Sequence, residues 1–400
     1  MIYGGLQRQS APNVLAQLKE FYRSGRLQAI FPAESRGCWS NETTLLTQQL
    51  GGHLPVDRTC STPEIDPESG CVITLWGRID NRDELIDAIG MRSPNLTDAA
   101  LVLAAWLRWR RDVVLHLVGD FVFAVYDPRD QCLFCARDHL GVRPFYYQLS
   151  EQQFVFSSSL LVLQEAGCCD LSIDQQWLAE SLMGVSMSFE KTPYRQILKL
   201  PPGHSLFVDS KSSNLQAYYR MSTESPLILK DSREYVEAYQ EQLEQAVRCR
   251  LVQKDSHKPF GSELSGGLDS STVTAFAADM LPNATSRLHS FSFANCELEP
   301  EYIHAVSMAS PMAATHIMGK RDPKLSSRER VLSVLGYPEE FANGSGHASI
   351  YRLAQRLNIR TLLSGFGGDE FVTTYRGLVL TELYNQGEYQ RLFDYIQERN

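Results

Sequence analysis

The 400-residue sequence lacks several features that mark whole classes of protein. No apolar run reaches the roughly 18 residues of a membrane span, and the start Met1–Leu6 has no signal-peptide pattern. A formal net charge of −9 argues against a nucleic-acid or anionic-membrane surface. These absences favour a cytoplasmic protein whose partners include neither nucleic acid nor a membrane.

The cysteines and histidines give little support for a metal or redox site, although Cys132 and Cys135 have the spacing of such a pair. The nine cysteines show no repeated pair spacing, and the nine histidines form no HExxH motif. Cys132 and Cys135 stand in an alternating, strand-like segment, where residues three apart point to opposite faces. We therefore expect buried, reduced thiols there, and the same at Cys168 and Cys169.

The length of the chain is sufficient for two domains. Residues 1–210 contain many short strand-like runs and two helical segments, of which the clearer is Asp98–Arg110 with Thr97 as its N-cap. The predicted strands include 119–126, 132–136, 144–147 and 153–156. This mixture predicts an α+β domain of layered sheets and helices.

The second half follows a different pattern. Residues 210–226 are polar and rich in turn-forming residues, so we place the domain boundary between 210 and 211. A predicted helix at 232–250 precedes strand-like runs that alternate with helices. These are strands 259–263, 288–293 and 361–363 and helices from 268, at 301–309 and at 348–357. Such alternation predicts an α/β domain with a parallel sheet, which binds ligands at the carboxyl ends of its strands.

The most informative stretch is Leu264–Ser271 (LSGGLDSS), between a predicted strand and a predicted helix. The free N–H groups and the helix dipole at such a turn attract anions, and the glycines let the backbone approach a phosphate closely. Asp269 would repel a phosphate unless it holds a Mg²⁺ ion that bridges to it. The motif therefore predicts chemistry on ATP.

A second glycine-rich turn, Ser364–Glu370 (SGFGGDE), follows the apolar run at 361–363. Asp369 in this turn and Asp269 each stand at a predicted strand end of one sheet. Two carboxylates on one Mg²⁺–triphosphate would hold the ion while backbone amides hold the pyrophosphate. The alternative is that each turn is only a tight connection.

These motifs resemble the asparagine synthetase-like superfamily of ATP pyrophosphatases, and the resemblance covers nearly the whole chain. In the first half it rests on Gly77–Leu85, Thr97–Asp98, Leu117–Ala124, Ala136–Tyr147 and Leu200–Gly203. It implies a glutaminase-like αββα sandwich at 1–210, of degenerate Ntn-hydrolase type. At 211–400 it implies an ATP-pyrophosphatase domain resembling the adenine nucleotide α-hydrolases. The chain ends in a helix-like pattern where the family continues with further helices, which leaves open whether this domain is C-terminally incomplete.

The resemblance implies a reaction and a set of site residues. In the family, a carboxylate attacks the α-phosphorus of ATP, giving an acyl-adenylate and pyrophosphate, and an amine then displaces AMP. Pyrophosphate binding is implied for Ser265, Gly266, Gly267, Asp269, Ser270 and Ser271, adenosine contact for Leu264, Phe293 and Gly365, and a further nucleotide contact for Gly367. Asp269 and Asp369 would ligate Mg²⁺ and, with Ser265, carry the catalysis. Phe293 has a core position as its alternative, and Glu301 is an open candidate for the polar lining.

Three positions depart from the family pattern. The glutaminase nucleophile is a cysteine directly after the initiator Met, and here that residue is Ile2. The Asn-Gly pair that helps to bind the oxyanion is replaced by Trp76-Gly77. Both changes predict a first domain that does not hydrolyse glutamine and serves as a scaffold. Phe366 stands where asparagine synthetases carry Glu, so it counts against asparagine synthesis and suits a larger apolar substrate.

This combination looks most like a lasso peptide cyclase, in which a side-chain carboxylate of a peptide is adenylated and the peptide's own N-terminal amine closes a macrolactam. ATP and Mg²⁺ are the implied cofactors and a precursor peptide the substrate, with a leader-peptide-binding protein and a protease as the usual partners. Three alternatives stay open: ammonia-dependent asparagine synthesis, ligation of small carboxylate and amine substrates as in β-lactam synthetases, and a non-catalytic nucleotide-binding scaffold.

Overall fold

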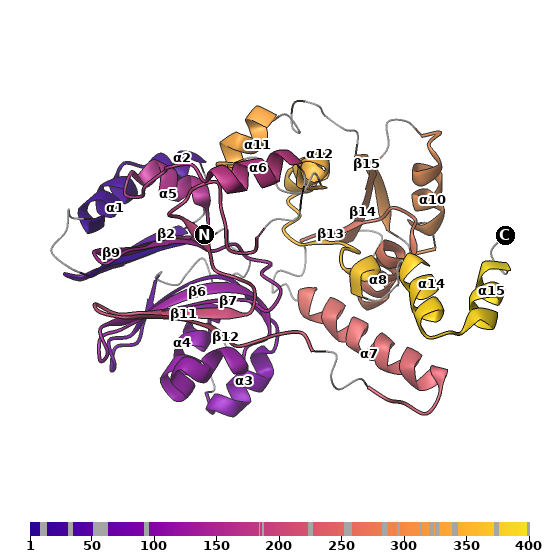
Figure 1. Cartoon of the computed structure of the whole chain (residues 1–400), viewed down its shortest axis with the longest axis horizontal. Coiled ribbons are helices and arrows are strands. Elements are labelled where there is room, and N and C mark those ends of the chain that lie inside the picture. Colours follow the sequence, from indigo (N-terminus) through magenta and orange to yellow (C-terminus); the bar gives the residue numbers. More distant parts are fainter. Residues whose placement is uncertain are drawn as a thin grey trace. The chain divides into compact units, whose positions relative to one another are not determined.

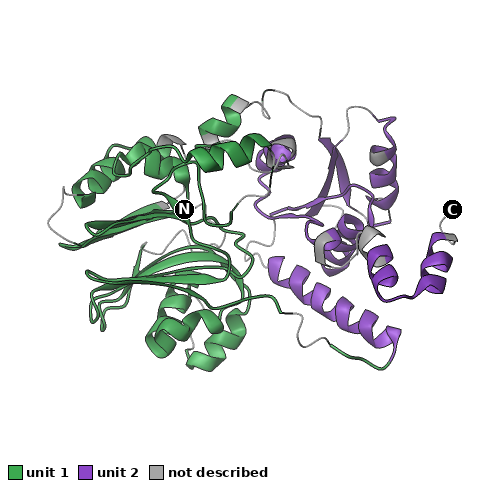
Figure 2. Ribbon diagram, viewed as in Figure 1, with its two compact units in different colours: residues 1–230, 253–255, 323–346 green, residues 231–252, 256–322, 347–400 purple. Residues whose placement is uncertain are grey.

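The chain forms two compact units, shown in different colours in Figure 2. Unit 1 comprises residues 1–230, 253–255 and 323–346, and unit 2 comprises residues 231–252, 256–322 and 347–400. The computed structural model describes residues 1–8, 14–30, 35–50, 63–91, 96–183, 185, 188–222, 227–251, 258–281, 287–293, 297–309, 311–312, 314–319, 324, 328–337, 343–371 and 376–397.

Unit 1 contains two antiparallel sheets with helices on their outer faces (Figure 1). One sheet has the order β10-β8-β9-β1-β3-β2 and the other β12-β11-β7-β6-β5-β4. The strands are β1 (Ile2–Gln7), β2 (Ser35–Ser40), β3 (Thr44–Leu50), β4 (Glu64–Ile65), β5 (Val72–Ile79), β6 (Gly119–Asp127), β7 (Cys132–Arg137), β8 (Tyr146–Leu149), β9 (Gln153–Ser157), β10 (Leu198–Lys199), β11 (His204–Val208) and β12 (Ser213–Ala217). The helices are α1 (Val14–Arg23), α2 (Arg26–Ile30), α3 (Arg82–Ile89), α4 (Asp98–Trp109), the 3-10 helix η2 (Arg110–Leu115), α5 (Leu160–Ala166), α6 (Gln175–Met183) and α11 (Arg328–Leu335).

Three hydrophobic cores hold these layers together because side chains alternate along each strand. The middle core joins the inner faces of the two sheets and includes Ile2, Val122 and Cys135. A second core packs α3 and α4 on the outer face of the β5–β6–β7 sheet, and a third packs α1 and α5 on the outer face of the other sheet. Unit 1 is therefore layered as helix, sheet, sheet, helix, which confirms the expected layered α+β domain.

The cysteines of β7 show this alternation directly. Cys132 lies in the core under α4 and Cys135 in the core between the sheets, and both are fully buried. Burial raises the pKa of the Cys132 thiol to about 12. The prediction of inert buried thiols on opposite faces is confirmed here. Cys168 and Cys169 were also predicted to be buried, and this prediction is only partly correct, because both residues are half-buried.

The predicted helix at 98–110 is confirmed as α4, and the Thr97 hydroxyl accepts a hydrogen bond from the Ala100 N–H at 2.9 Å. Two other expectations need correction. Unit 1 has more helices than the two predicted segments, since short amphipathic helices such as α1 are weak signals in sequence. The polar stretch placed at the domain boundary begins with the tight turn between β11 and β12, and the first segment of unit 1 continues to Lys230.

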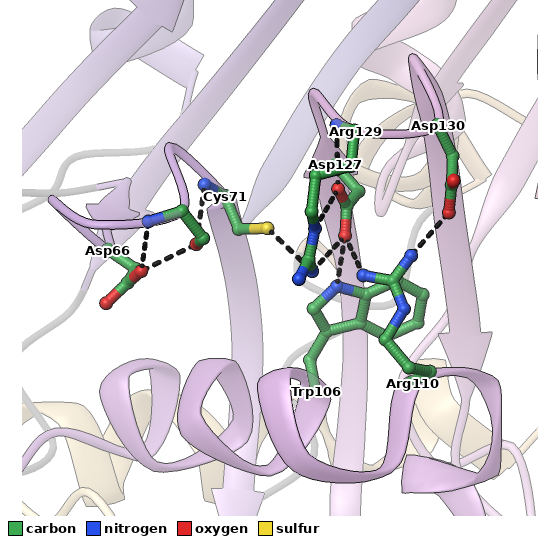
Figure 3. Close-up of polar contacts among 8 residues, drawn as sticks. Asp66, Cys71, Trp106, Arg110, Asp127, Arg129 and Asp130 are labelled. Carbon is green, nitrogen blue, oxygen red and sulfur yellow. Dashed lines mark hydrogen bonds and ion pairs between the residues drawn. The ribbon is translucent and has the colours of Figure 1, made fainter.

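A buried carboxylate fixes the turn between β6 and β7 (Figure 3). The side chain of Asp127 is fully buried and accepts hydrogen bonds from the Trp106 indole N–H at 3.0 Å and from Arg129 at 2.6–3.0 Å. Arg110 adds an ion pair. Burial alone would raise the pKa of Asp127, but these hydrogen bonds outweigh it and hold the pKa well below its usual range.

A segment from the second half of the sequence also belongs to unit 1. The Gly336 carbonyl accepts a hydrogen bond from the Gln164 side-chain amide of α5 at 2.7 Å. The hydroxyl of Tyr337 lies 3.2 Å from that of Tyr146 on β8. No motif or periodicity in the sequence predicts this docking.

Unit 2 contains a parallel sheet with the order β15-β14-β13-β16. Its strands are β13 (Phe260–Glu263), β14 (Leu288–Phe293), β15 (Thr315–Gly319) and β16 (Leu362–Leu363). Its helices are α7 (Ser232–Arg250), α8 (Leu268–Met280), α10 (Pro300–Ala309), most of α12 (Asn343–Arg356), α13 (Gly368–Phe371), α14 (Arg376–Asn385) and α15 (Tyr389–Gln397).

Separate cores cover this sheet. Phe260 and Leu288 pack with α7 and α8, whereas Phe291 of β14 packs with Ile350 and Ala354 of α12. The predicted parallel sheet, flanked by helices, is thereby confirmed, and the predicted helix 232–250 and strand 288–293 have the observed bounds. Among the helices that the structure describes, none has the length and apolar character needed to cross a membrane.

Candidate functional site

The first predicted loop connects β13 to α8. Gly266 has a φ of +83°, and a Cβ atom there would lie 2.6 Å from the Cβ of His304 on α10, so the turn requires glycine. Gly267 is the N-cap of α8 and has extended backbone, and no side chain caps the helix. The positive end of the helix dipole is therefore presented at this loop, as anion binding requires.

The serines of this loop contact one another. The Ser265 and Ser270 hydroxyls lie 3.1 Å apart, and the Ser270 hydroxyl accepts a hydrogen bond from the Ser265 N–H at 3.2 Å. Ser271 is only 5% exposed, and its hydroxyl has no hydrogen-bond partner among the residues that the structure describes. A buried hydroxyl without a partner costs about 1–3 kcal/mol, so Ser271 is a feature that a bound ligand would explain.

The second predicted loop, 364–367, connects β16 to α13. β16 pairs in parallel with β13, with Leu363 beside Ser262, so the two loops leave neighbouring strands at the same edge of the sheet. A Cβ atom on Gly365 would lie 2.6 Å from the backbone nitrogen of Ser270, and one on Gly368 would lie 2.5 Å from Oδ2 of Asp269. The two motifs, a hundred residues apart in sequence, are thus in direct contact.

The contact between the two loops lies where the direction of strand order in the sheet reverses. From β13 the chain proceeds to β14 and β15 on one side, and β16 then returns to the other side of β13. Parallel sheets bind ligands at the carboxyl ends of the strands where the direction of strand order reverses. The loops of β13 and β16 flank that reversal, so the site residues predicted in the two loops are brought together there.

The predicted adenosine contacts lie at the same edge. Leu264 is buried against Ala305 and Ala309 of α10, and its N–H donates to the Phe291 carbonyl at 2.7 Å. Phe293, the last residue of β14, is half-buried and packs partly against the core with α12. Gly367 has a φ of +99° in the second loop. Glu301 lies in α10, but its side chain is outside the described part of the structure.

Asp269 and Asp369 differ in exposure. Asp269 is half-buried beneath Gly368, whereas Asp369 is exposed in the first turn of α13. In the described ranges no group of three or more His, Cys, Asp or Glu side chains could hold a metal by itself. Two carboxylates fit Mg²⁺, because this ion is usually held by one or two carboxylates together with substrate phosphates and water.

The sequence analysis missed a polar pair beside these loops. The Nδ1 atom of His347 on α12 lies 2.8 Å from Oε1 of Glu263, the last residue of β13. The His347 ring also meets the Phe293 ring edge-on, with centroids 4.9 Å apart. A carboxylate directly before Leu264 was a detectable signal, but nothing in the sequence indicates His347 as its partner.

The position of the missing glutaminase nucleophile lies in unit 1. Ile2, at the start of β1, is fully buried in the core between the two sheets, and its N–H donates to the Ser158 hydroxyl at 3.0 Å. Trp76 lies under the guanidinium of Arg143, 4.7 Å from the ring centroid. An aliphatic side chain and an indole ring therefore take the two positions where the family pattern has a thiol and an amide.

Comparison with known protein families agrees with both halves of this description. Residues 32–219 match the family described as glutamine amidotransferase domain, and residues 238–396 match the asparagine synthase family. The chain is therefore asparagine synthetase-like, with one of these two domain families matched in each half. The first match covers most of the N-terminal layered domain, and the second covers the C-terminal parallel sheet.

Three relatives illustrate the range of this family. The chain is 27% identical to the putative asparagine synthetase [glutamine-hydrolyzing] 2 of Methanocaldococcus jannaschii, over 82% of its own length. It is 32% identical to asparagine synthetase [glutamine-hydrolyzing] 3 of Bacillus subtilis over 54%, and 25% identical to amidase chry2 of Gibberella zeae over 70%. The chain spans 63%, 35% and 43% of the lengths of these relatives.

Proposed function

We propose that the chain is an ATP-dependent carbon–nitrogen ligase that adenylates a carboxylate and then forms an amide. The observation that carries this proposal is the direct contact between the two glycine-rich loops at the β13–β16 reversal. One loop presents an uncapped helix N-terminus with a buried, unpartnered hydroxyl, and the other adds a second carboxylate. Such a site suits a polyphosphate better than a simple turn, which would have no need of these groups.

The reaction divides into two steps. An oxygen of the substrate carboxylate attacks the α-phosphorus of ATP, and the bond to the β-phosphate oxygen breaks to release pyrophosphate. The N–H groups at the start of α8 and the hydroxyls of Ser265, Ser270 and Ser271 stabilise the charge that develops on this leaving group. An amine then attacks the acyl carbon, loses a proton and displaces AMP.

Asp269 and Asp369 are the residues that would hold Mg²⁺ in this site. When bound, the ion supplies Lewis-acid neutralisation of the phosphate charge. The carboxylate of Asp269 is positioned by the backbone of the second loop, since Gly368 leaves no room for a side chain between them. The position of the proposed metal-binding residue in the first motif therefore depends on the position of the second motif.

Unit 1 serves as a scaffold in this proposal and does not supply ammonia. The buried Ile2 provides no thiol, and Trp76 provides no amide donor for an oxyanion. The amine must then come from solution or from the substrate itself. A substrate that carries both its carboxylate and its amine makes the second step effectively unimolecular.

For the substrate we propose a precursor peptide whose side-chain carboxylate and N-terminal amine are joined in a macrolactam. Phe366 supports an apolar substrate, because 81% of its surface is exposed in the second loop, where an acidic residue would favour ammonia chemistry. A leader-peptide-binding protein and a protease are the expected partners of such a reaction.

ATP–pyrophosphate exchange tests the proposal. We expect exchange, and AMP formation, when ATP and Mg²⁺ are supplied with a precursor peptide that has both a side-chain carboxylate and a free N-terminus. Acetylation of that N-terminus should leave exchange intact and abolish the cyclic product. Asparagine formed from aspartate and ammonia would contradict the peptide substrate, and binding of ATP without exchange for any carboxylate would favour the non-catalytic scaffold.

A further inference from the structure

The Glu263–His347 pair has no part in the reaction described above, although it lies at the functional edge of the sheet. Glu263 ends β13 directly before Leu264, and Phe293 ends the neighbouring strand β14. Both side chains of the pair are largely shielded from solvent, with 17% of Glu263 and 31% of His347 exposed. Because the two side chains are shielded, solubility of the surface does not explain why a polar pair occupies this position.

The geometry of His347 connects the two strand ends. Its Nδ1 atom is held by the Glu263 carboxylate at 2.8 Å, which fixes the direction of the imidazole ring. The ring then meets the Phe293 ring edge-on, with an angle of 84° between the two planes. Edge-to-face contacts of this kind orient aromatic rings and contribute beyond the area that they bury. Glu263 therefore orients His347, and His347 orients Phe293.

We propose that Glu263 and His347 are positioning residues that hold the Phe293 ring as a preformed wall of the adenosine subsite. The inference rests on the proposed function, because it assumes that a nucleotide base lies against Phe293. A ring that is already fixed loses little conformational freedom when a base stacks on it, so affinity for the base increases. Neither residue belongs to the two glycine-rich loops, so the pair should leave pyrophosphate binding unchanged.

Separate titrations of the full chain with AMP and with inorganic pyrophosphate, both in Mg²⁺, test this division. In His347→Ala and Glu263→Ala we expect the Kd for AMP to rise about 3- to 10-fold and the Kd for pyrophosphate to stay within about 2-fold. Glu263→Gln should restore AMP affinity, because its amide oxygen still accepts the imidazole N–H. Gln355→Ala, an exposed change on the same helix, is the control and should alter neither constant.

A double variant tests whether His347 acts through Phe293. Phe293→Leu combined with His347→Ala should bind AMP no more weakly than Phe293→Leu alone. Additive losses, unchanged AMP affinity in His347→Ala, or equal losses for AMP and pyrophosphate would each overturn the inference. A wild-type chain that binds pyrophosphate but not AMP overturns this inference alone, whereas one that binds neither overturns the proposed function as well.

Discussion

Asp127, at the end of β6 in unit 1, and Ser271, in the first turn of α8 in unit 2, are both buried polar groups, but their surroundings are opposite. Asp127 accepts hydrogen bonds from Trp106 and Arg129 and forms an ion pair with Arg110. In the part of the chain that the structure describes, the Ser271 hydroxyl has no partner and no side chain caps the start of its helix. The chain satisfies the first group by itself, whereas in our proposal a bound pyrophosphate would satisfy the second.

This difference distinguishes buried polar groups that stabilise the fold from buried polar groups that are available to a ligand. A buried charge that is fully hydrogen-bonded stabilises the fold around it, whereas an unpartnered buried group lowers stability until a ligand completes it. The same contrast distinguishes the two halves of the family architecture here. The predicted glutaminase position in unit 1 contains Ile2 and Trp76, and the predicted nucleotide position in unit 2 retains the hydroxyls and carboxylates.

The largest effect is expected at Asp269. Asp269→Ala should lower the rate of AMP formation by about 10³-fold, because the site loses a ligand for the Mg²⁺ ion that would neutralise the leaving pyrophosphate. Thermal unfolding should change little, since the carboxylate is half-buried and not part of a core. Asp279→Ala, an exposed change on the same helix, is the control and should retain full activity. Activity retained in Asp269→Ala would refute its role.

Removal of the charge on Asp127 should lower the stability of unit 1 and leave the rate of AMP formation unchanged. Asp127→Asn should destabilise unit 1 by about 3 kcal/mol, because two arginines lose a buried partner. The depressed pKa of Asp127 means that its stabilising effect is present above the unfolded-state pKa of about 3.9 and is lost as the pH falls through the native value. Thermal melts should show a large difference between wild type and variant at pH 7 that shrinks below about pH 4. Asp130→Asn, at a half-exposed partner of Arg110, should show neither effect, and an equally stable Asp127→Asn would contradict the comparison.

Ser271 should show the reverse pattern on a smaller scale. Ser271→Ala should raise the Kd for pyrophosphate about 5-fold, the value of one hydrogen bond of roughly 1 kcal/mol. Its melting temperature should stay the same or rise, since the variant removes a buried group without a partner. Thr272→Ala, whose hydroxyl donates to the Leu268 carbonyl, should leave the Kd unchanged. A destabilised Ser271→Ala with normal pyrophosphate binding would show that Ser271 is structural.

The smallest effect is expected from restoring a thiol to unit 1. Ile2→Cys should leave glutamine hydrolysis at background in an ammonia-release assay, because Trp76 still stands where the family pattern has an amide. The change from isoleucine to cysteine keeps an apolar group in the core, so the fold should persist. Ammonia released from glutamine by this variant would show that unit 1 retains more of a glutaminase site than its residues indicate.

The elements that sequence analysis predicted well are those with strong local patterns. The helix 232–250 and the strand 288–293 were predicted with their observed bounds, and Thr97 caps α4 as expected. Local patterns failed where an element is short or a turn is ambiguous. The polar residues after Val208 form a hairpin turn inside unit 1, because the same turn chemistry serves a hairpin and a domain linker.

Both candidate loops were also predicted, since glycine, serine and aspartate at a strand-to-helix turn carry their chemistry in a few adjacent residues. Their contact was only inferred from the expected sheet, and the structure supplies it through Gly365 and Gly368 against the start of α8. His347 could not be predicted, because its relation to Glu263 depends on how α12 packs on the sheet and leaves no sequence spacing to detect.

The sequence by itself determined the local elements, the two glycine-rich loops and the absence of a cysteine at position 2, because each of these is encoded within a few consecutive residues. The tertiary structure decided which of these elements meet. The order of the parallel strands placed β16 beside β13, the docking of residues 336–337 assigned a distant segment to unit 1, and α12 brought His347 to Glu263. Contacts between residues so far apart in the chain arise from close packing of whole elements, for which a single sequence has no local signal.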